Sequence, residues 1–89
     1  MNSSAGWRLK VRDKIYKALA ELPPSDRKRL LAAIEGLSSN PYIGDVDKMK
    51  GEENTWRRRI GSYRIFYEII LQDKIIYVFR VERRTSKTY

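Results

Sequence analysis

Arginine side chains are concentrated in the stretch WRRRIGSYRIFYE, which runs from Trp56 to Glu68. The arginines of this stretch are Arg57, Arg58, Arg59 and Arg64. A second pair, Arg83 and Arg84, follows another apolar stretch, and Tyr89 is the last residue of the sequence. Because a planar guanidinium donates two parallel hydrogen bonds to a phosphate group, these clusters predict a site for a phosphate-bearing ligand.

The charge of the chain is uneven. The 89 residues carry a formal net charge of +8, which favours a polyanionic partner. Residues 1–54 contain 10 Lys and Arg against 8 Asp and Glu, whereas residues 55–89 contain 9 against 3. The basic character therefore belongs to the C-terminal part, where the arginine clusters lie.

Several chemistries are excluded by composition. The chain has no cysteine and no histidine, which removes disulfides, thiolate nucleophiles and the commonest metal ligand and general base. No cofactor or metal is expected. The N-terminal residues lack an apolar signal-peptide region, and no apolar run approaches the roughly 20 residues of a membrane span. A cytoplasmic protein that does not bind membranes is therefore expected.

The elements that must position the arginines begin with a short strand from Trp7 to Val11, after a flexible tail over residues 1–6. Asp13 is the expected cap of a first helix, which ends at Pro23 and Pro24. Ser25 is the expected cap of a second helix, which ends at Asn40-Pro41. The stretch from Tyr42 to Asn54 is predicted to be a loop.

Three strands are expected after this loop: residues 56–60, 63–71 and 74–81, separated by turns at Gly61-Ser62 and Gln72-Asp73. The last is apolar on both faces, which is typical of a central strand. Residues 7–89 therefore predict a single α+β domain with the order β-α-α-β-β-β. In it, a helical hairpin packs on one face of a small, mainly antiparallel, four-stranded sheet.

Strand alternation predicts which face each arginine takes. If Tyr63, Ile65 and Tyr67 face the helices, Arg64 lies on the open face. A tight hairpin then places Arg57 or Arg59 beside it. Arg58 falls on the helix-facing side, either with its stem reaching past the helices or under incomplete cover.

The arginine face has two interpretations. Like charges so close repel one another, which favours an anion site; the alternative is a solvated sheet face whose arginines protect an edge strand. Lys48 and Lys50, in the preceding loop, extend the basic surface or are simply solvated.

The chain resembles the RelE/ParE toxin superfamily, and within it the RelE-type mRNA interferases, from Trp7 to Tyr89. The resemblance lies in the layout of the elements, the Asn40-Pro41 ending of the second helix, the KMKG motif of residues 48–51 and the WRRRIGSYRIFYE stretch. It implies the toxin of a type II toxin–antitoxin system. It further implies a metal-independent endoribonuclease that cleaves messenger RNA in the ribosomal A site and is neutralised by a cognate antitoxin.

The resemblance also implies roles for individual residues. Arg64 matches the arginine that contacts the scissile phosphate, and Arg57 and Arg59 match basic residues of the neighbouring strand. Arg84 matches the arginine after the last strand, although Arg83 could exchange roles with it. Tyr89 matches the C-terminal tyrosine that stacks on or activates the nucleotide. Lys48 and Lys50 are the further candidates for RNA binding.

RNA cleavage without a metal needs a deprotonated 2′-OH, a stabilised phosphorane and a stabilised leaving 5′-oxygen. Arginines supply the second requirement, because they are always cationic donors. Tyr89 is the candidate general base, since neighbouring guanidiniums would favour its phenolate. Glu68 is a second possible base, although a cross-strand charge partner is the more ordinary role for it.

Two alternatives remain open from the sequence. The first is a ParE-like toxin that inhibits DNA gyrase without cutting nucleic acid. The second is a non-catalytic RNA-binding module that stacks bases on Trp56, Phe66 and Tyr77. Strand spacing makes core packing the ordinary role of such aromatic residues, of Trp56 above all.

Overall fold

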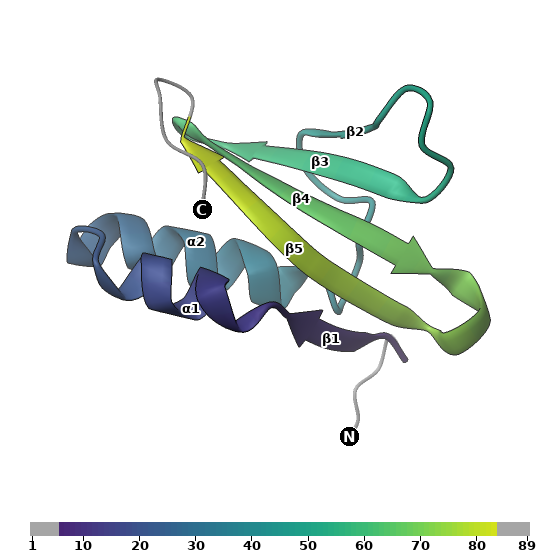
Figure 1. The fold of residues 1–89 in the computed structure, drawn as a ribbon, viewed down its shortest axis with the longest axis horizontal. Coiled ribbons are helices and arrows are strands. Elements are labelled where there is room, and N and C mark those ends of the chain that lie inside the picture. Colours follow the sequence, from purple (N-terminus) through teal and green to yellow (C-terminus); the bar gives the residue numbers. More distant parts are fainter. Residues whose placement is uncertain (1–5, 84–89) are drawn as a thin grey trace.

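The computed structural model describes residues 6–83. Its elements, in chain order, are β1 (Arg8–Val11), α1 (Asp13–Ala20), α2 (Pro24–Gly36), β2 (Val46–Lys48), β3 (Thr55–Ile60), β4 (Tyr63–Ile70), a 3-10 turn η1 (Leu71–Asp73) and β5 (Ile75–Arg83) (Figure 1). None of the helices in this part of the chain is long and apolar enough to cross a membrane.

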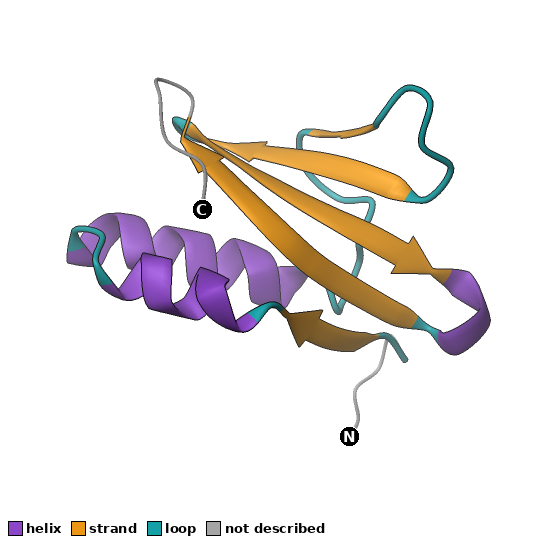
Figure 2. Cartoon of the chain, viewed as in Figure 1, coloured by secondary structure: helices purple, strands orange, loops and turns teal. Residues whose placement is uncertain are grey.

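One sheet organises the molecule, with the strand order β1-β5-β4-β3-β2. β1 runs parallel to β5, and the other neighbouring pairs are antiparallel. Both helices pack on the same face of this sheet, so that its other face carries no helix (Figure 2). We call that second face the open face. The predicted α+β class, with a helical hairpin on one face of the sheet, is confirmed.

The sheet has five strands, where four were expected. β2 lies inside the stretch predicted as a loop, and it pairs with β3 through Val46 opposite Arg58 and Asp47 opposite Arg57. A three-residue segment containing Asp and Lys has no strand periodicity of its own. It becomes a strand because the edge of β3 has unpaired backbone groups. The pairing continues past β2, where the Met49 amide donates to the Thr55 carbonyl at 2.8 Å.

The expected helix caps were wrong, by one position for α1 and by two positions for α2. α1 begins at Asp13 itself, after Arg12, and α2 begins at Pro24, after Pro23. Neither flanking residue makes a side-chain capping hydrogen bond. Proline at the first helical position is favoured because its fixed φ suits a helix and the N–H that it lacks would have no partner there. Acidic residues in both first turns also interact favourably with the helix dipole.

The core lies between the helices and the helix-facing side of the sheet. As predicted, Tyr63, Ile65 and Tyr67 of β4 point into it and are at most 4% exposed. The helices contribute their regularly spaced apolar residues, chiefly Ile15, Leu19, Leu30 and Ile34. This packing fixes the face of every residue on β4, including Arg64.

β5 is a central strand, as predicted, because it lies between β1 and β4. Its register changes in the middle: Phe66 pairs with Arg80, but Tyr67 pairs with Val78, which leaves Phe79 as an extra residue. This β-bulge begins directly after the last residue paired with β1. It reverses the alternation, so that Val78 and Val81 are both fully buried although they are three positions apart.

Candidate functional site

The tight turn between β3 and β4 brings the predicted arginines together. Gly61 and Ser62 alone separate the strands, and Arg59 lies directly opposite Arg64. Gly61 adopts a φ of +57°, which glycine reaches without steric cost. Two-residue spacing places Arg57 on the same open face as Arg59, so the sequence prediction for this face is confirmed.

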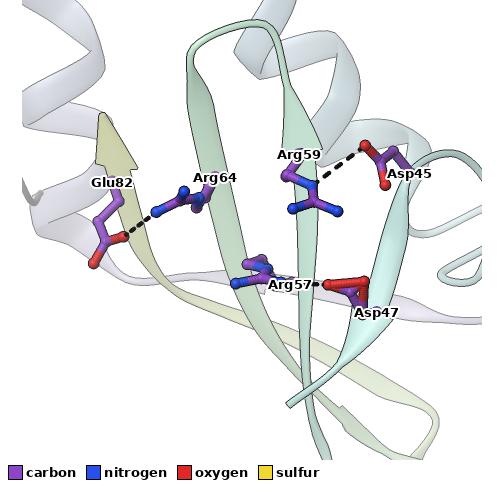
Figure 3. A network of polar contacts seen from close by, with 6 residues as sticks. All are labelled: Asp45, Asp47, Arg57, Arg59, Arg64 and Glu82. Carbon is purple, nitrogen blue, oxygen red and sulfur yellow. Dashed lines mark hydrogen bonds and ion pairs between the residues drawn. The ribbon is translucent and has the colours of Figure 1, made fainter. Parts of the chain in front are cut away.

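Each of these arginines is paired with a carboxylate (Figure 3). Arg57 donates to Asp47 at 2.5 Å, Arg59 donates to Asp45 at 3.3 Å, and Arg64 contacts Glu82 at 3.5 Å. Glu82 also accepts a hydrogen bond from Arg80, so one carboxylate serves two guanidiniums. The repulsion expected between clustered arginines is therefore already offset within the protein, and the cluster alone does not require a ligand.

The pairs of Arg57 and Arg59 differ in strength. The hydrogen bond from Arg57 lowers the pKa of Asp47 below its ordinary value, against a smaller opposing effect of desolvation. The Arg57 side chain is 25% exposed, whereas the Arg59 side chain is 46% exposed and that of its partner Asp45 is 63% exposed. Screening by water weakens exposed pairs, so Arg59 is the less firmly held of the two.

Arg59 and Arg64 share a polar concavity at the turn end of the hairpin. Its volume is about 290 Å³, and its lining is Asp45, Arg59, Gly61 and Arg64. The Nε atom of Arg64 is buried and makes no hydrogen bond to any residue between positions 6 and 83. Two neighbouring guanidiniums at one polar hollow can together bind one phosphate group.

Arg80 joins this face, and sequence reasoning missed it. Its guanidinium lies 5.0 Å from the ring centre of Phe66, beside the pair with Glu82. Uninterrupted alternation along β5 would have placed Arg80 on the helix-facing side. The bulge after Val78 turns it to the open face instead. No local pattern in the sequence signals that bulge.

The last strand separates Arg83 from this cluster. Arg83 lies opposite Tyr63, on the helix-facing side, with its guanidinium 5.7 Å from the Tyr63 ring centre. The Tyr63 hydroxyl donates to Asp26 of α2 at 3.0 Å, which confirms the side. The structure therefore does not bring Arg83 to Arg64. The other C-terminal candidates, Arg84 and Tyr89, lie outside the described residues.

Neither candidate lysine joins the cluster. Lys48 lies opposite Trp56 in the β2–β3 pair, and so on the helix-facing side of the edge strand. Lys50 is an exposed residue of the turn that follows β2. The structure thus brings together Arg57, Arg59 and Arg64 of the predicted site residues.

Arg58 lies on the helix-facing side, as alternation predicts. Its guanidinium packs against Gly44, where an added Cβ would lie 3.0 Å from the Arg58 Cζ atom. Nearby, the hydroxyl of the fully buried Tyr67 donates to the Pro41 carbonyl at 2.5 Å. Burial raises the pKa of Tyr67 to about 12, so the phenol is neutral at physiological pH. These contacts hold the segment after α2 in place and are not part of the open face.

The aromatic side chains do not form a stacking platform. Trp56 faces the helices and meets Tyr42 edge-on, with 5.3 Å between the ring centres. Phe66 is only 8% exposed, although it lies on the open face. Tyr77 alone of the three expected stacking residues is partly exposed there, beside Phe79. An RNA-binding module built on these rings is therefore not supported by their positions.

Comparison with known proteins gives consistent matches. The sequence model for the ParE toxin of the type II toxin–antitoxin system parDE matches residues 8–87. The chain is 32% identical over 81 residues to the RelE1 protein of Methanocaldococcus jannaschii, covering 88% of this chain and 90% of that protein. A chain of the archaeal RelE–RelB complex from Pyrococcus horikoshii OT3 superposes with a TM-score of 0.78 at 29% identity, covering 92% of this chain and 99% of that one.

The fold recurs in a more distant structure. The isolated E. coli RelE toxin superposes with a TM-score of 0.74, covering 91% of this chain and 87% of that one. Its sequence identity to this chain is 18%, so the likeness concerns the fold.

Proposed function

Because the chain belongs to the ParE toxin family of type II toxin–antitoxin systems, within the RelE/ParE superfamily, we propose that it is an endoribonuclease that cleaves messenger RNA. The observation that carries this proposal is the shared concavity of Arg59 and Arg64, with Arg57 on the same face. It suits a phosphodiester, because two guanidiniums line one polar hollow.

In this proposal, the 2′-OH of one nucleotide attacks the adjacent scissile phosphate. Arg59 and Arg64 donate hydrogen bonds to the phosphorane oxygens as negative charge develops on them. Arg57, which keeps its pair with Asp47, adds positive charge beside the bound phosphates. Loss of one such donor typically lowers the rate by about 10²–10³-fold.

Proton transfer is assigned to the C-terminal residues. Tyr89 accepts the 2′-OH proton, and Arg84 supports the 5′-oxygen that leaves as the P–O5′ bond breaks. Arg83 takes no part, because it lies on the helix-facing side. Tyr89→Phe is expected to slow single-turnover cleavage while leaving RNA affinity nearly unchanged. An unaltered cleavage rate would remove Tyr89 from proton transfer. No metal or cofactor takes part in this scheme.

The proposed partners are messenger RNA on the ribosome and a cognate antitoxin, and the proposed site of action is the cytoplasm. Relatives have been crystallised as a RelE–RelB complex from Pyrococcus horikoshii OT3 and as a RelB–RelE antitoxin–toxin complex from Methanococcus jannaschii, which supports an antitoxin partner here. A ribosomal A site would hold the 2′-OH in line with the phosphate. Cleavage of naked RNA is then expected to be weak.

Inducible expression tests the proposal. Wild type, Arg64→Ala and Arg8→Ala are expressed in turn, and cellular mRNA is mapped by primer extension. Arg8 is the control, because it lies on β1, which pairs with the end of β5 farthest from the β3–β4 turn. We expect cuts within translated codons for wild type and Arg8→Ala, and none for Arg64→Ala. Growth arrest without cuts would contradict the proposal.

Inhibition of DNA gyrase without cleavage is the second candidate function. It is favoured by the family model itself, which describes a ParE toxin of parDE systems. The same induced cultures separate the two functions. A gyrase inhibitor would induce DNA damage and leave mRNA intact, whereas a nuclease would arrest translation first.

A further inference from the structure

Two ion pairs of the open face, Arg57 with Asp47 and Arg59 with Asp45, differ in how firmly they hold the arginine. Asp47 and Arg57 are 2.5 Å apart, and this contact lowers the pKa of Asp47. Asp45 and Arg59 are 3.3 Å apart, through the single Nε donor of Arg59, and both side chains are largely exposed. The first pair is a firm link between neighbouring strands. The second leaves the terminal N–H groups of Arg59 available.

The backbone holds Asp45 at the edge of the concavity. Its carbonyl accepts the Arg59 amide at 2.9 Å, and the preceding Gly44, at a φ of +91°, accepts the Val46 amide at 3.0 Å. The Asp45 side chain lines the same hollow as Arg59 and Arg64. A carboxylate is therefore presented, on a fixed backbone, to the guanidiniums that suit a phosphate.

From this arrangement we infer that Asp45 is an internal competitor of the phosphate ligand. In the free protein it holds Arg59, and an incoming phosphate group displaces it. The inference rests on the proposed function for the identity of that ligand as an RNA phosphodiester. Asp47 keeps Arg57 throughout, because its pair is shorter and less exposed.

The exchange is favourable because the ligand contacts more than Asp45 does. Among the arginines that the structure describes, Asp45 is paired with Arg59 alone, at 3.3 Å. Arg59 and Arg64 are direct cross-strand partners, whose Cβ atoms lie about 5 Å apart in such pairs. A phosphate between them accepts hydrogen bonds from both guanidiniums. The exposed pair that it replaces contributes little to stability.

A consequence is selectivity at this site. An anion that reaches only Arg59 merely replaces one weak pair by another and gains nothing. A phosphodiester that spans both arginines gains a second set of charge-assisted hydrogen bonds. Displacement of Asp45 costs each of these anions the same free energy, so the added contact with Arg64 decides which of them binds.

The matched variants are Asp45→Asn and Asp47→Asn, since each removes one negative charge from the same face. The probe is a short fluorescein-labelled single-stranded RNA with 2′-O-methyl groups, which cannot be cleaved, and inorganic phosphate serves as competitor. Fluorescence anisotropy at low salt measures both affinities. We expect Asp45→Asn to raise the affinity for RNA about two- to tenfold, with a parallel gain for inorganic phosphate.

The inference is wrong if Asp47→Asn raises the affinity as much as Asp45→Asn, because the gain would then be a general charge effect. It also predicts that Arg59→Gln abolishes the gain from Asp45→Asn, because Asp45 then no longer has a guanidinium to hold away from the ligand. A gain that persists in this double variant would contradict it equally. Asp45→Ser repeats the test should the Asn variant unfold in a thermal melt.

These outcomes are separate from those of the proposed function. Cuts in cellular mRNA together with no affinity gain for Asp45→Asn would leave the nuclease standing and overturn the competitor. A gain for Asp45→Asn without any cuts would support the competitor and overturn the nuclease. Inorganic phosphate shows whether the gain belongs to the phosphate group itself or requires the RNA chain.

Discussion

At the scale of single residues, the open face combines cations with their own counterions. Arg57, Arg59 and Arg64 are each paired with a carboxylate from a different segment. Such pairing keeps a cationic site stable before any ligand arrives. It also means that a ligand competes with carboxylates as well as with water, so pair strength decides which arginine it engages first.

The phenol of Tyr67 is expected to stabilise the segment after α2. Tyr67→Phe leaves the Pro41 carbonyl without its donor in a buried position, at a cost of about 1–3 kcal/mol in the free energy of unfolding. Urea unfolding measures this loss. Tyr16→Phe is the matched control, because Tyr16 is 50% exposed and should change stability little. Equal effects of the two substitutions would show that the buried hydrogen bond contributes nothing.

The same residue predicts a loss of stability in alkali. The Tyr67 pKa is about 12 in the folded protein and about 10 in the unfolded chain. The stabilisation is therefore complete below pH 10 and is lost as the pH rises towards 12, because the unfolded chain releases the proton first. Tyr67→Phe should remove this part of the pH dependence when unfolding is followed across that range.

Asp47 predicts a loss of stability in acid. Its folded pKa lies below the ordinary value of 3.8, so its pair with Arg57 stabilises the fold above pH 3.8 and is lost as the pH falls through the folded pKa. Asp47→Asn should destabilise the protein at neutral pH, and the difference from wild type should shrink in acid. Urea unfolding of both proteins, at neutral pH and at a pH below 3.8, measures this difference in the free energy of unfolding. A difference that stays constant with pH would mean that Asp47 acts through something other than its charge.

At the scale of elements, the β3–β4 hairpin and the bulge in β5 assemble the site together. The two-residue turn sets Arg59 opposite Arg64. The bulge turns Arg80 and Glu82 to the same face while keeping Val78 and Val81 in the core. Without that extra residue, the C-terminal half of β5 would expose its valine and bury its arginine.

The turn glycine predicts a test by contrast with another glycine. Gly61→Ala forces alanine into a φ of +57° and brings its Cβ within 2.8 Å of the Arg29 guanidinium. The left-handed conformation alone costs about 1–2 kcal/mol. Gly36→Ala, at the end of α2 with nothing within 4 Å of the added carbon, should instead stabilise by about 0.5–1 kcal/mol. Urea unfolding of both variants checks the opposite signs, and a shared sign would contradict the role of the turn.

At the scale of the whole molecule, the net charge of +8 is distributed unevenly around the sheet. The arginine cluster sets Arg57, Arg59, Arg64 and Arg80 against Asp45, Asp47 and Glu82, so it is less cationic than its arginines alone suggest. Much of the excess positive charge therefore lies elsewhere on the protein. The net charge of the whole protein therefore governs the long-range attraction of a polyanion, whereas the arginine cluster governs its binding at one place.

Salt dependence of RNA binding should report this separation. Each phosphate contact contributes about −0.7 to the slope of log affinity against log salt for single-stranded nucleic acid. Arg64→Ala is expected to make the slope less negative by about 0.7, whereas Arg8→Ala should leave it nearly unchanged. Anisotropy titrations over a range of salt concentrations measure both slopes. Equal changes would mean that the RNA responds to net charge and not to the concavity.

Much of the fold could be predicted because its signals are local. Alternation along residues 56–71 identified the hairpin and the face of its arginines, and the apolar spacing with its prolines identified both helices. The short strand β2 and the bulge at Phe79 could not be predicted, since each depends on pairing with a strand distant in the sequence. Arg80 was missed for that reason, and the placement of Arg83 on the helix-facing side was not anticipated.

By itself, the sequence determined the order of the two helices and four of the five strands, the α+β class and the common face of Arg57, Arg59 and Arg64. These follow from spacing within one helix, strand or hairpin. Only the tertiary structure decided which carboxylate accompanies each arginine. Asp45 and Asp47 reach the hairpin through the pairing of β2 with β3, and Glu82 reaches it through the pairing of β4 with β5. Such contacts join positions that no local pattern relates, and here they determine how tightly each arginine is held before a ligand arrives.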